Sequence, residues 1–307
     1  MERRIGRYVT EKEDGYSLQH FLRASMKLSQ REISRAKFRK NGICVNKEQK
    51  KVSALLRAGE LVEVLLEPEE ASSPVLAPSN KSIRILYEDC DVIVLDKPAG
   101  VLVHPAGKGS FDKDTLANRL ACYLREKGED SVIRFPGRLD KDTSGVILAA
   151  KNQAAAARIE RQREEGMLVK TYFALTDGVP ERMRGEITVP IEADPSDRTR
   201  MRVSFGGKRA VTRYEVLKTG KGGTSALLKV RIETGRMHQI RVHMAYEGTP
   251  LLGDSLYGRK DAETFGMERT ALHAGELLFY QPFEERQICV KAPLPKDVAS
   301  VLRSVIE

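Results

Sequence analysis

Apolar residues recur at two different spacings in the first part of the chain, and the spacings predict helices followed by strands. Between residues 18 and 26 the apolar positions lie three or four apart, as on the buried face of a helix: Leu18, Phe21, Leu22 and Met26. Ser29 is a favourable N-cap for a second helix, which Asn41 and Gly42 would end. Residues 43–45 and 61–65 are mainly apolar and are predicted to form short strands.

A second pattern of strands and helices begins after an interruption rich in proline and serine. Residues 67–80 contain three prolines, three serines and no apolar period, which is typical of a linker. Beyond it, strands are predicted at residues 83–87, 92–95, 146–150, 168–176, 184–217 and 226–233, and helices at 115–127, 152–166 and 234–248. On the last of these helices, His238 and Arg241 would share a face.

These patterns divide the chain into four parts. A lead-in at residues 1–14, with one strand at 7–10, precedes a small domain at 15–66, the linker at 67–80 and a large domain at 81–307. No internal repeat is visible.

One polar loop contains more charged and hydroxyl side chains than a connection to a strand needs. From residue 138 to residue 144 it carries two cations, two carboxylates and two hydroxyls: Arg138, Asp140, Lys141, Asp142, Thr143 and Ser144. An apolar segment follows it directly. The residues alone allow two interpretations, a tight turn in which Gly145 takes a positive φ or a catalytic loop built around a carboxylate.

The loop closely resembles the catalytic signature of the RluA family of pseudouridine synthases, in the form Arg-Leu-Asp-Lys-Asp-Thr-Ser-Gly at 138–145. Other stretches resemble the remaining motifs of that family in the same order: 96–104, 170–172, 234–243, 250–258 and 272–274. Gly137 departs from the pattern, because the family usually has His there. We expect altered packing of this loop, since that His is not the catalytic group.

The resemblance implies an α+β fold, in which helices pack on an antiparallel or mixed sheet with the active cleft across its middle. It also implies the isomerisation of uridine to pseudouridine in RNA, which requires no metal and no cofactor. Asp140 would be the catalytic carboxylate, Arg241 its cationic partner, and Tyr172 the ring that stacks on the extruded uracil and assists proton transfer. Lys170 would lie beside Tyr172, Arg138 would fill the gap left by the flipped base, and Leu272 would form an apolar wall.

The small domain resembles the S4 RNA-binding domain over residues 15–66, which implies contacts to RNA. Its second predicted helix has three arginines at four-residue spacing, Arg31, Arg35 and Arg39. They could be a solvated helix face, or they could position RNA phosphates. S4-bearing members of the family typically modify large-subunit ribosomal RNA, so RNA, and ribosomal RNA in particular, is the expected partner.

Charge and cysteine usage agree with an RNA-binding protein of a reducing compartment. The chain has a formal net charge of +9, and residues 15–50 contain nine Lys or Arg against two Glu. The four cysteines form no C-x-x-C pair, and the chain shows neither a signal peptide nor a run of apolar residues that could span a membrane. We therefore expect a cytoplasmic monomer with no membrane contact.

Several other classes of site lack their motifs. The chain contains no Walker loop, no G-x-G-x-x-G after a strand, no H-E-x-x-H and no G-x-S-x-G. Asp140 and Asp142 are too close in sequence to flank a sugar as a glycosidase pair. A noncatalytic RNA-binding or ribosome assembly factor that retains the fold stays open as the alternative, and replacement of Asp140 by Asn or Ala separates it from an isomerase.

Overall fold

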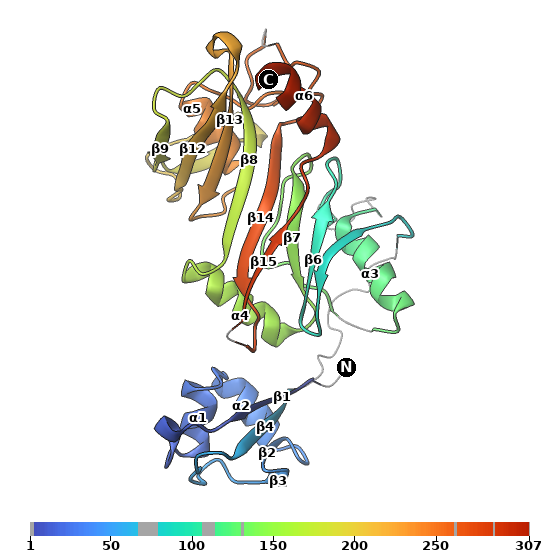
Figure 1. The fold of residues 1–307 in the computed structure, drawn as a ribbon, viewed down its shortest axis with the longest axis vertical. Coiled ribbons are helices and arrows are strands. Elements are labelled where there is room, and N and C mark those ends of the chain that lie inside the picture. The colour runs from blue at the N-terminus through green and yellow to red at the C-terminus, as the bar shows by residue number, and fades with distance from the viewer. Residues whose placement is uncertain are drawn as a thin grey trace. The chain divides into compact units, whose positions relative to one another are not determined.

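The computed structural model describes residues 3–66, 79–105, 114–129, 132–260, 263–284 and 286–306. Most of the predicted linker, at 67–78, lies outside these ranges. The described residues form two compact units, of which the first is essentially residues 3–66 and the second most of the remainder (Figure 1). None of the helices in these ranges combines the length and the apolar content needed to cross a bilayer.

The small unit contains two helices and a four-stranded sheet. The helices are α1 (Leu18–Ala24) and α2 (Gln30–Lys37), and the sheet has the order β1-β4-β2-β3, with β1 (Arg3–Tyr8), β2 (Ile43–Val45), β3 (Glu48–Gln49) and β4 (Leu61–Leu66). A short 3₁₀ helix (Glu11–Glu13) joins β1 to α1. The core residues include the predicted apolar positions Leu18, Phe21 and Leu22, which are fully buried.

The predicted cap of the second helix is present. The Ser29 hydroxyl accepts the Glu32 amide at 3.2 Å, and the Glu32 carboxylate accepts the Ser29 amide at 2.7 Å, so two amides that lack helical partners are satisfied.

Two predictions for the small unit were wrong. Residues 3–8 are not part of a separate lead-in: β1 pairs with β4 along its whole length. The sequence contains no signal for this strand, because Ile5 is its only buried residue and one buried position shows no alternation.

The second helix ends at Lys37, and Arg39 is half-buried in the following turn, while Arg31 and Arg35 are exposed on α2. The chain turns there because Gly42 approaches the helix end so closely that a Cβ would lie 1.9 Å from the Ala36 carbonyl oxygen.

The large unit is built on a nine-stranded mixed sheet. The strand order is β5-β6-β7-β14-β8-β13-β12-β9, with β15 paired to β14. The strands are β5 (Arg84–Glu88), β6 (Val92–Lys97), β7 (Ser144–Ala150), β8 (Val169–Asp177), β9 (Arg184–Ile187), β12 (Thr212–Thr219), β13 (Ser225–Ile232), β14 (Leu272–Tyr280) and β15 (Gln287–Lys291). Figure 1 shows β8, β14, β7 and β6 crossing the middle of this unit.

Four helices and one separate hairpin complete the large unit. The helices are α3 (Leu116–Glu126), α4 (Gln153–Glu164), α5 (Gln239–Tyr246) and α6 (Lys296–Ile306), and the hairpin pairs β10 (Ile191–Asp194) with β11 (Asp197–Val203). A 3₁₀ turn (Lys221–Gly223) lies between β12 and β13. Leu116, Leu120 and Leu124 of α3, predicted from their spacing, join the core of the sheet, as does Ile159 of α4. The predicted α+β class with a mixed sheet is confirmed.

Among the described residues the sheet contains one parallel strand pair, and it lies directly after the signature loop. Strand β7 pairs in parallel with β14 through two residues, Ser144 with His273 and Gly145 with Ala274. Gly145 takes φ +108°, and a Cβ there would lie 2.1 Å from the Ala274 carbonyl oxygen. Only glycine fits this position, which bears out the expected positive φ.

Candidate active site

A pocket of about 570 Å³ opens in the large unit where the signature loop meets the sheet. Its lining comes from that loop, the end of α4, β8, the end of β13 with the turn after it, the start of α5 and the start of β14. The structure brings six of the predicted site residues to this one pocket: Arg138, Asp140, Lys170, Tyr172, Arg241 and Leu272.

A buried ion pair aims Arg241 at Asp140. The Arg241 Nε and Nη2 atoms donate to the two Asp254 carboxylate oxygens, each at 2.7 Å. The Asp254 side chain is completely buried, and its Oδ1 also accepts the amides of Leu256 and Tyr257. The remaining terminal nitrogen, Nη1, lies 4.0 Å from Asp140 Oδ2.

The electrostatics of Arg241 follow from this arrangement. Burial lowers its pKa, but the hydrogen bonds to Asp254 and the charges of Asp254 and Asp140 outweigh burial, so the pKa is raised. The guanidinium also lies over the Tyr257 ring, with 5.1 Å between its central carbon and the ring centroid. Arg241 is therefore a fixed cation beside the Asp140 carboxylate.

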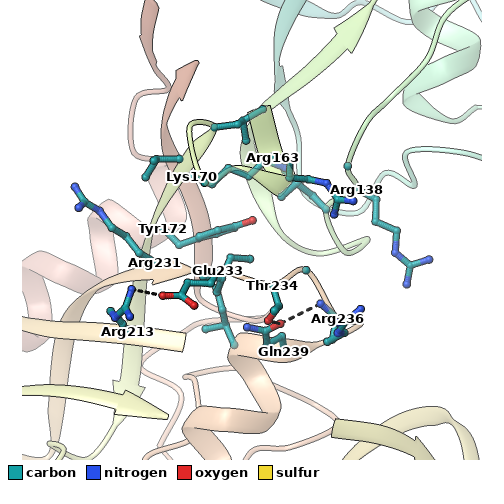
Figure 2. A pocket seen from close by; sticks show the side chains of 18 of the residues that line it. Arg138, Arg163, Lys170, Tyr172, Arg213, Arg231, Glu233, Thr234, Arg236 and Gln239 are labelled. Carbon is teal, nitrogen blue, oxygen red and sulfur yellow. Dashed lines mark hydrogen bonds and ion pairs between the residues drawn. The ribbon is translucent and has the colours of Figure 1, made fainter. Parts of the chain in front are cut away.

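Tyr172 extends from β8 into the pocket. It is 5% exposed, and Figure 2 shows its side chain reaching into the pocket with the hydroxyl group foremost. Burial raises its pKa far above the ordinary value, and the negative charge of Asp140 adds to the rise. The phenol therefore stays protonated near neutral pH and presents a flat face and a hydroxyl donor.

Lys170 shares the pocket face of β8 with Tyr172, as the two-residue period predicts. Burial, and to a smaller extent the positive charge of Arg163, lower the pKa of Lys170 to about 8. A Cβ at Gly137 would lie 3.0 Å from Lys170 Nζ. The ammonium group therefore lies next to the loop, in space that a side chain at residue 137 would need.

Of the remaining predicted pocket residues, Leu272 is buried and Arg138 is exposed. Leu272 is 3% exposed and forms an apolar part of the pocket wall. Arg138 is exposed, and no hydrogen bond or ion pair of its side chain occurs within the described ranges. Its guanidinium is thus available to a ligand.

Two cations that the motifs did not single out hold the loop behind Asp140. Lys97 is fully buried, and its Nζ donates to the carbonyl oxygens of Lys141 (2.8 Å), Pro98 and Val101. Arg269 Nη1 donates to the Asp142 carbonyl oxygen at 3.0 Å. Burial lowers the pKa of Lys97 to about 7, against the opposing charges of Asp142 and Asp140.

Sequence reasoning missed these two residues and Asp254. Lys97 and Asp254 lie inside the motifs at 96–104 and 250–258, and a charged residue in an apolar stretch is the signal that could have found them, because buried charges require partners. The predicted helical face shared by His238 and Arg241 was wrong. His238 precedes α5 with φ +54°, and its Nδ1 lies 2.9 Å from the Tyr257 hydroxyl.

The pocket is strongly cationic. Its lining contains eight Lys or Arg and four Asp or Glu, and two of its arginines, Arg209 and Arg213, are ion-paired with Glu233. Figure 2 shows Arg213 beside Glu233 and Arg236 beside Gln239. Such a lining favours a polyanionic ligand.

The described residues contain one group with the composition of a metal site, Asp89, Cys90 and Asp91 in the turn between β5 and β6. Asp89 Oδ1 accepts the amides of Asp91 and Val92, so it caps the turn. None of the three lines the pocket.

Comparison with known proteins gives consistent matches over most of the chain. Residues 91–246 match the family described as RNA pseudouridylate synthase. The chain is 37% identical to the uncharacterized RNA pseudouridine synthase YhcT of Bacillus subtilis, over 96% of this chain and 95% of that protein. It is 35% identical to the ribosomal large subunit pseudouridine synthase D of Haemophilus ducreyi, over 86% and 82%. Among solved structures, human RNA pseudouridylate synthase domain containing 1 is similar with a TM-score of 0.60 and 26% identity, over 74% of this chain and 89% of that one.

Proposed function

Since the chain belongs to the RluA-type family of RNA pseudouridine synthases, we propose that it isomerises particular uridines in the RNA of the large ribosomal subunit. The name of the Haemophilus ducreyi relative, ribosomal large subunit pseudouridine synthase D, supports this substrate. The excess of cations in the pocket lining supports a polyanion.

The reaction is an isomerisation, so atoms and electrons balance within the substrate. The bond between N1 of uracil and C1′ of ribose breaks, the base turns, and a bond from C5 to C1′ forms. A proton leaves C5 and a proton is gained at N1. The proposed chemistry requires neither an oxidant nor a metal.

Asp140 is the proposed catalytic carboxylate, and the observation that carries the proposal is its position 4.0 Å from the anchored Arg241 in the pocket that Tyr172 enters. Its carboxylate could attack the base or the sugar, or assist loss of the base. Arg241 keeps a positive charge beside the carboxylate. Its hydrogen bonds to Asp254 hold the guanidinium in place and raise its pKa.

The remaining pocket residues are assigned to holding the extruded base. Tyr172 offers a neutral ring for stacking on uracil, and Leu272 closes the apolar side. Arg138 is exposed at the loop and would fill the gap in the base stack with its planar guanidinium. Lys170 supplies a cation close to the stacked base.

The small unit is proposed to be an S4-like RNA-binding domain. Arg31 and Arg35 are exposed on α2, which suits contacts to phosphates. Arg39, in the turn beyond the helix, is assigned to the same surface with a smaller contribution because it is half-buried.

Replacement of Asp140 by Asn tests the function directly. Pseudouridine in total RNA is mapped in cells without the protein, with the native chain and with Asp140→Asn. The native chain should restore specific sites, and the variant should restore none while it still binds RNA.

Asp142→Asn is the matched control, because Asp142 is a carboxylate in the same loop that does not line the pocket. It should keep conversion. A native chain that restores no site, or an Asp140→Asn variant that supports ribosome assembly as well as the native chain does, would favour a noncatalytic assembly factor instead.

The proposed setting is the cytoplasm, with the protein as a monomer. All four cysteines are free, which agrees with a reducing compartment.

A further inference from the structure

The chain between β11 and β12 makes a tight turn that presents an aromatic ring to solvent. The Gly207 amide donates to the Ser204 carbonyl oxygen at 2.9 Å and closes the turn around Phe205 and Gly206. Phe205 is 93% exposed, more than any other large apolar side chain of the described residues. Water is an unfavourable environment for this ring, so the exposure needs an explanation.

The turn is held rigidly in place. Ser204 N donates to the Pro190 carbonyl oxygen at 3.0 Å, and Ile191 and Lys208 exchange two backbone hydrogen bonds, of 3.0 and 2.9 Å. A Cβ at Gly207 would lie 2.6 Å from the carbonyl carbon of Ile191. A ligand that stacks on Phe205 would therefore order little of the protein on binding.

The segment of sequence around Phe205 is rich in positively charged residues. Residues 197–209 contain five Lys or Arg and one acidic residue, Asp197. Lys208, three residues after Phe205, is exposed, and within the described ranges its side chain has no ion pair. Arg198 is exposed too, but it lies at the far end of β11, about 16 Å of extended strand before Val203. An exposed aromatic ring with a free cation close to it in the chain is an arrangement that single-stranded nucleic acids bind, through base stacking and phosphate contacts.

Two connections link the turn to residues of the candidate active site, one along the chain and one through a hydrogen bond. Arg209, four residues after Phe205, lines the pocket, and a fully extended chain places their Cα atoms within about 14 Å. The Met201 amide of β11 donates to the Tyr257 hydroxyl oxygen at 2.7 Å, and the Tyr257 ring lies against Arg241. The backbone at Phe205 is thus held within about 14 Å of a residue that lines the pocket.

We propose that Phe205 is a stacking site for an unpaired base of the RNA substrate, next to the target uridine, with Lys208 contacting a flanking phosphate. The proposal rests on the proposed function, since it takes RNA as the substrate. It adds a specificity element outside the pocket, one that selects targets in loops or bulges where a neighbouring base is free to stack.

The chain has no tryptophan, so Phe205→Trp introduces a single fluorophore at the proposed contact. In an Asp140→Asn background, which leaves the RNA unmodified, titration with a substrate hairpin should quench the indole emission. Tyr246→Trp is the matched control, because Tyr246 is 57% exposed on α5 and does not line the pocket. Its emission should not change. An unquenched Phe205→Trp variant that binds the hairpin overturns the proposal.

Kinetics give a second and independent readout. Phe205→Ala should raise KM for the hairpin about tenfold and leave kcat within about twofold, because one stacked base is lost and the chemistry is untouched. Phe205→Tyr should keep the native KM, and Phe205→Leu should behave like Ala. A native KM in the Ala or Leu variant overturns the proposal, whereas absence of pseudouridine formation by the native chain overturns the proposed function instead.

Discussion

Asp254→Asn is the change that tests most directly whether the buried ion pair orients Arg241, the proposed cationic partner of Asp140. In the native protein, Asp254 occupies two donor positions of Arg241 and leaves Nη1 for Asp140 at 4.0 Å. The Asn amide has nearly the same shape, but it has no charge and offers one acceptor where the carboxylate offered two. Arg241 should lose its fixed orientation.

The size of the effect follows from burial and distance. Removal of one partner of a buried pair costs about 3–5 kcal/mol, and Asn should lie at the lower end because it keeps one acceptor. A loss of about 3 kcal/mol would lower the melting temperature of a unit of this size by about 6–12 °C. Two unit charges 4 Å apart interact by about 4 kcal/mol at an effective dielectric constant of 20. That sets a ceiling of about a thousandfold on kcat, and because the Asp140 side chain is 22% exposed we expect a loss of about 10- to 100-fold.

The assay combines thermal unfolding with single-turnover conversion at saturating RNA, below the melting temperature of the variant. Glu284→Gln is the control, because it breaks the pair between Glu284 and Arg286, both about half exposed, and should change neither property appreciably. An Asp254→Asn variant that melts lower but keeps kcat within twofold would refute the idea that Asp254 orients Arg241 for catalysis.

Three further predictions concern the backbone, the pH profile and the small unit. Gly145→Ala should destabilise the protein by at least about 3 kcal/mol in denaturant unfolding, because a Cβ collides with β14, whereas Gly248→Ala, with φ +81° and no atom within 4 Å, should lose only about 1 kcal/mol. The pKa of Lys170 is about 8, so its charge disappears as pH rises through 8; KM for RNA should increase above that pH, and a Lys170→Gln variant with the same pH profile as the native protein would contradict this. The double variant Arg31→Gln and Arg35→Gln should flatten the slope of log K for RNA binding against log salt by about 1.4 to 1.8, measured by filter binding, and an unchanged slope would argue against phosphate contacts by α2.

Local patterns predicted the central strands β6 and β7 of the large unit because these strands are buried. Every residue of β7 is buried, so an unbroken apolar run marks it, and α3 shows its leucines at helical spacing. The edge strand β1 escaped because one buried isoleucine leaves no period to detect. The left-handed residue before α5 could not be read from residue types, since its conformation depends on tertiary contacts.

The motifs identified the residues that line the pocket but not the interactions that hold them there. Asp140, Tyr172 and Arg241 lie far apart in sequence and were grouped by resemblance alone. Lys97 and Arg269 hold the loop through its own backbone carbonyls, those of Lys141 and Asp142. Carbonyls are present at every position, so no sequence pattern distinguishes the ones that a buried cation will select.

The two-residue parallel pairing of β7 with β14 has a mechanical consequence. It joins two parts of the sheet. One part is β5, β6 and β7, and the loop of Asp140 runs directly into β7; the other part begins with β14 and includes β8, which carries Tyr172. Neighbouring pairs are longer, with six residues in register between β6 and β7 and six between β14 and β8. A small twist at this narrow joint would change the separation of Asp140 from Arg241 and would disturb fewer backbone hydrogen bonds than a twist at either longer strand pair.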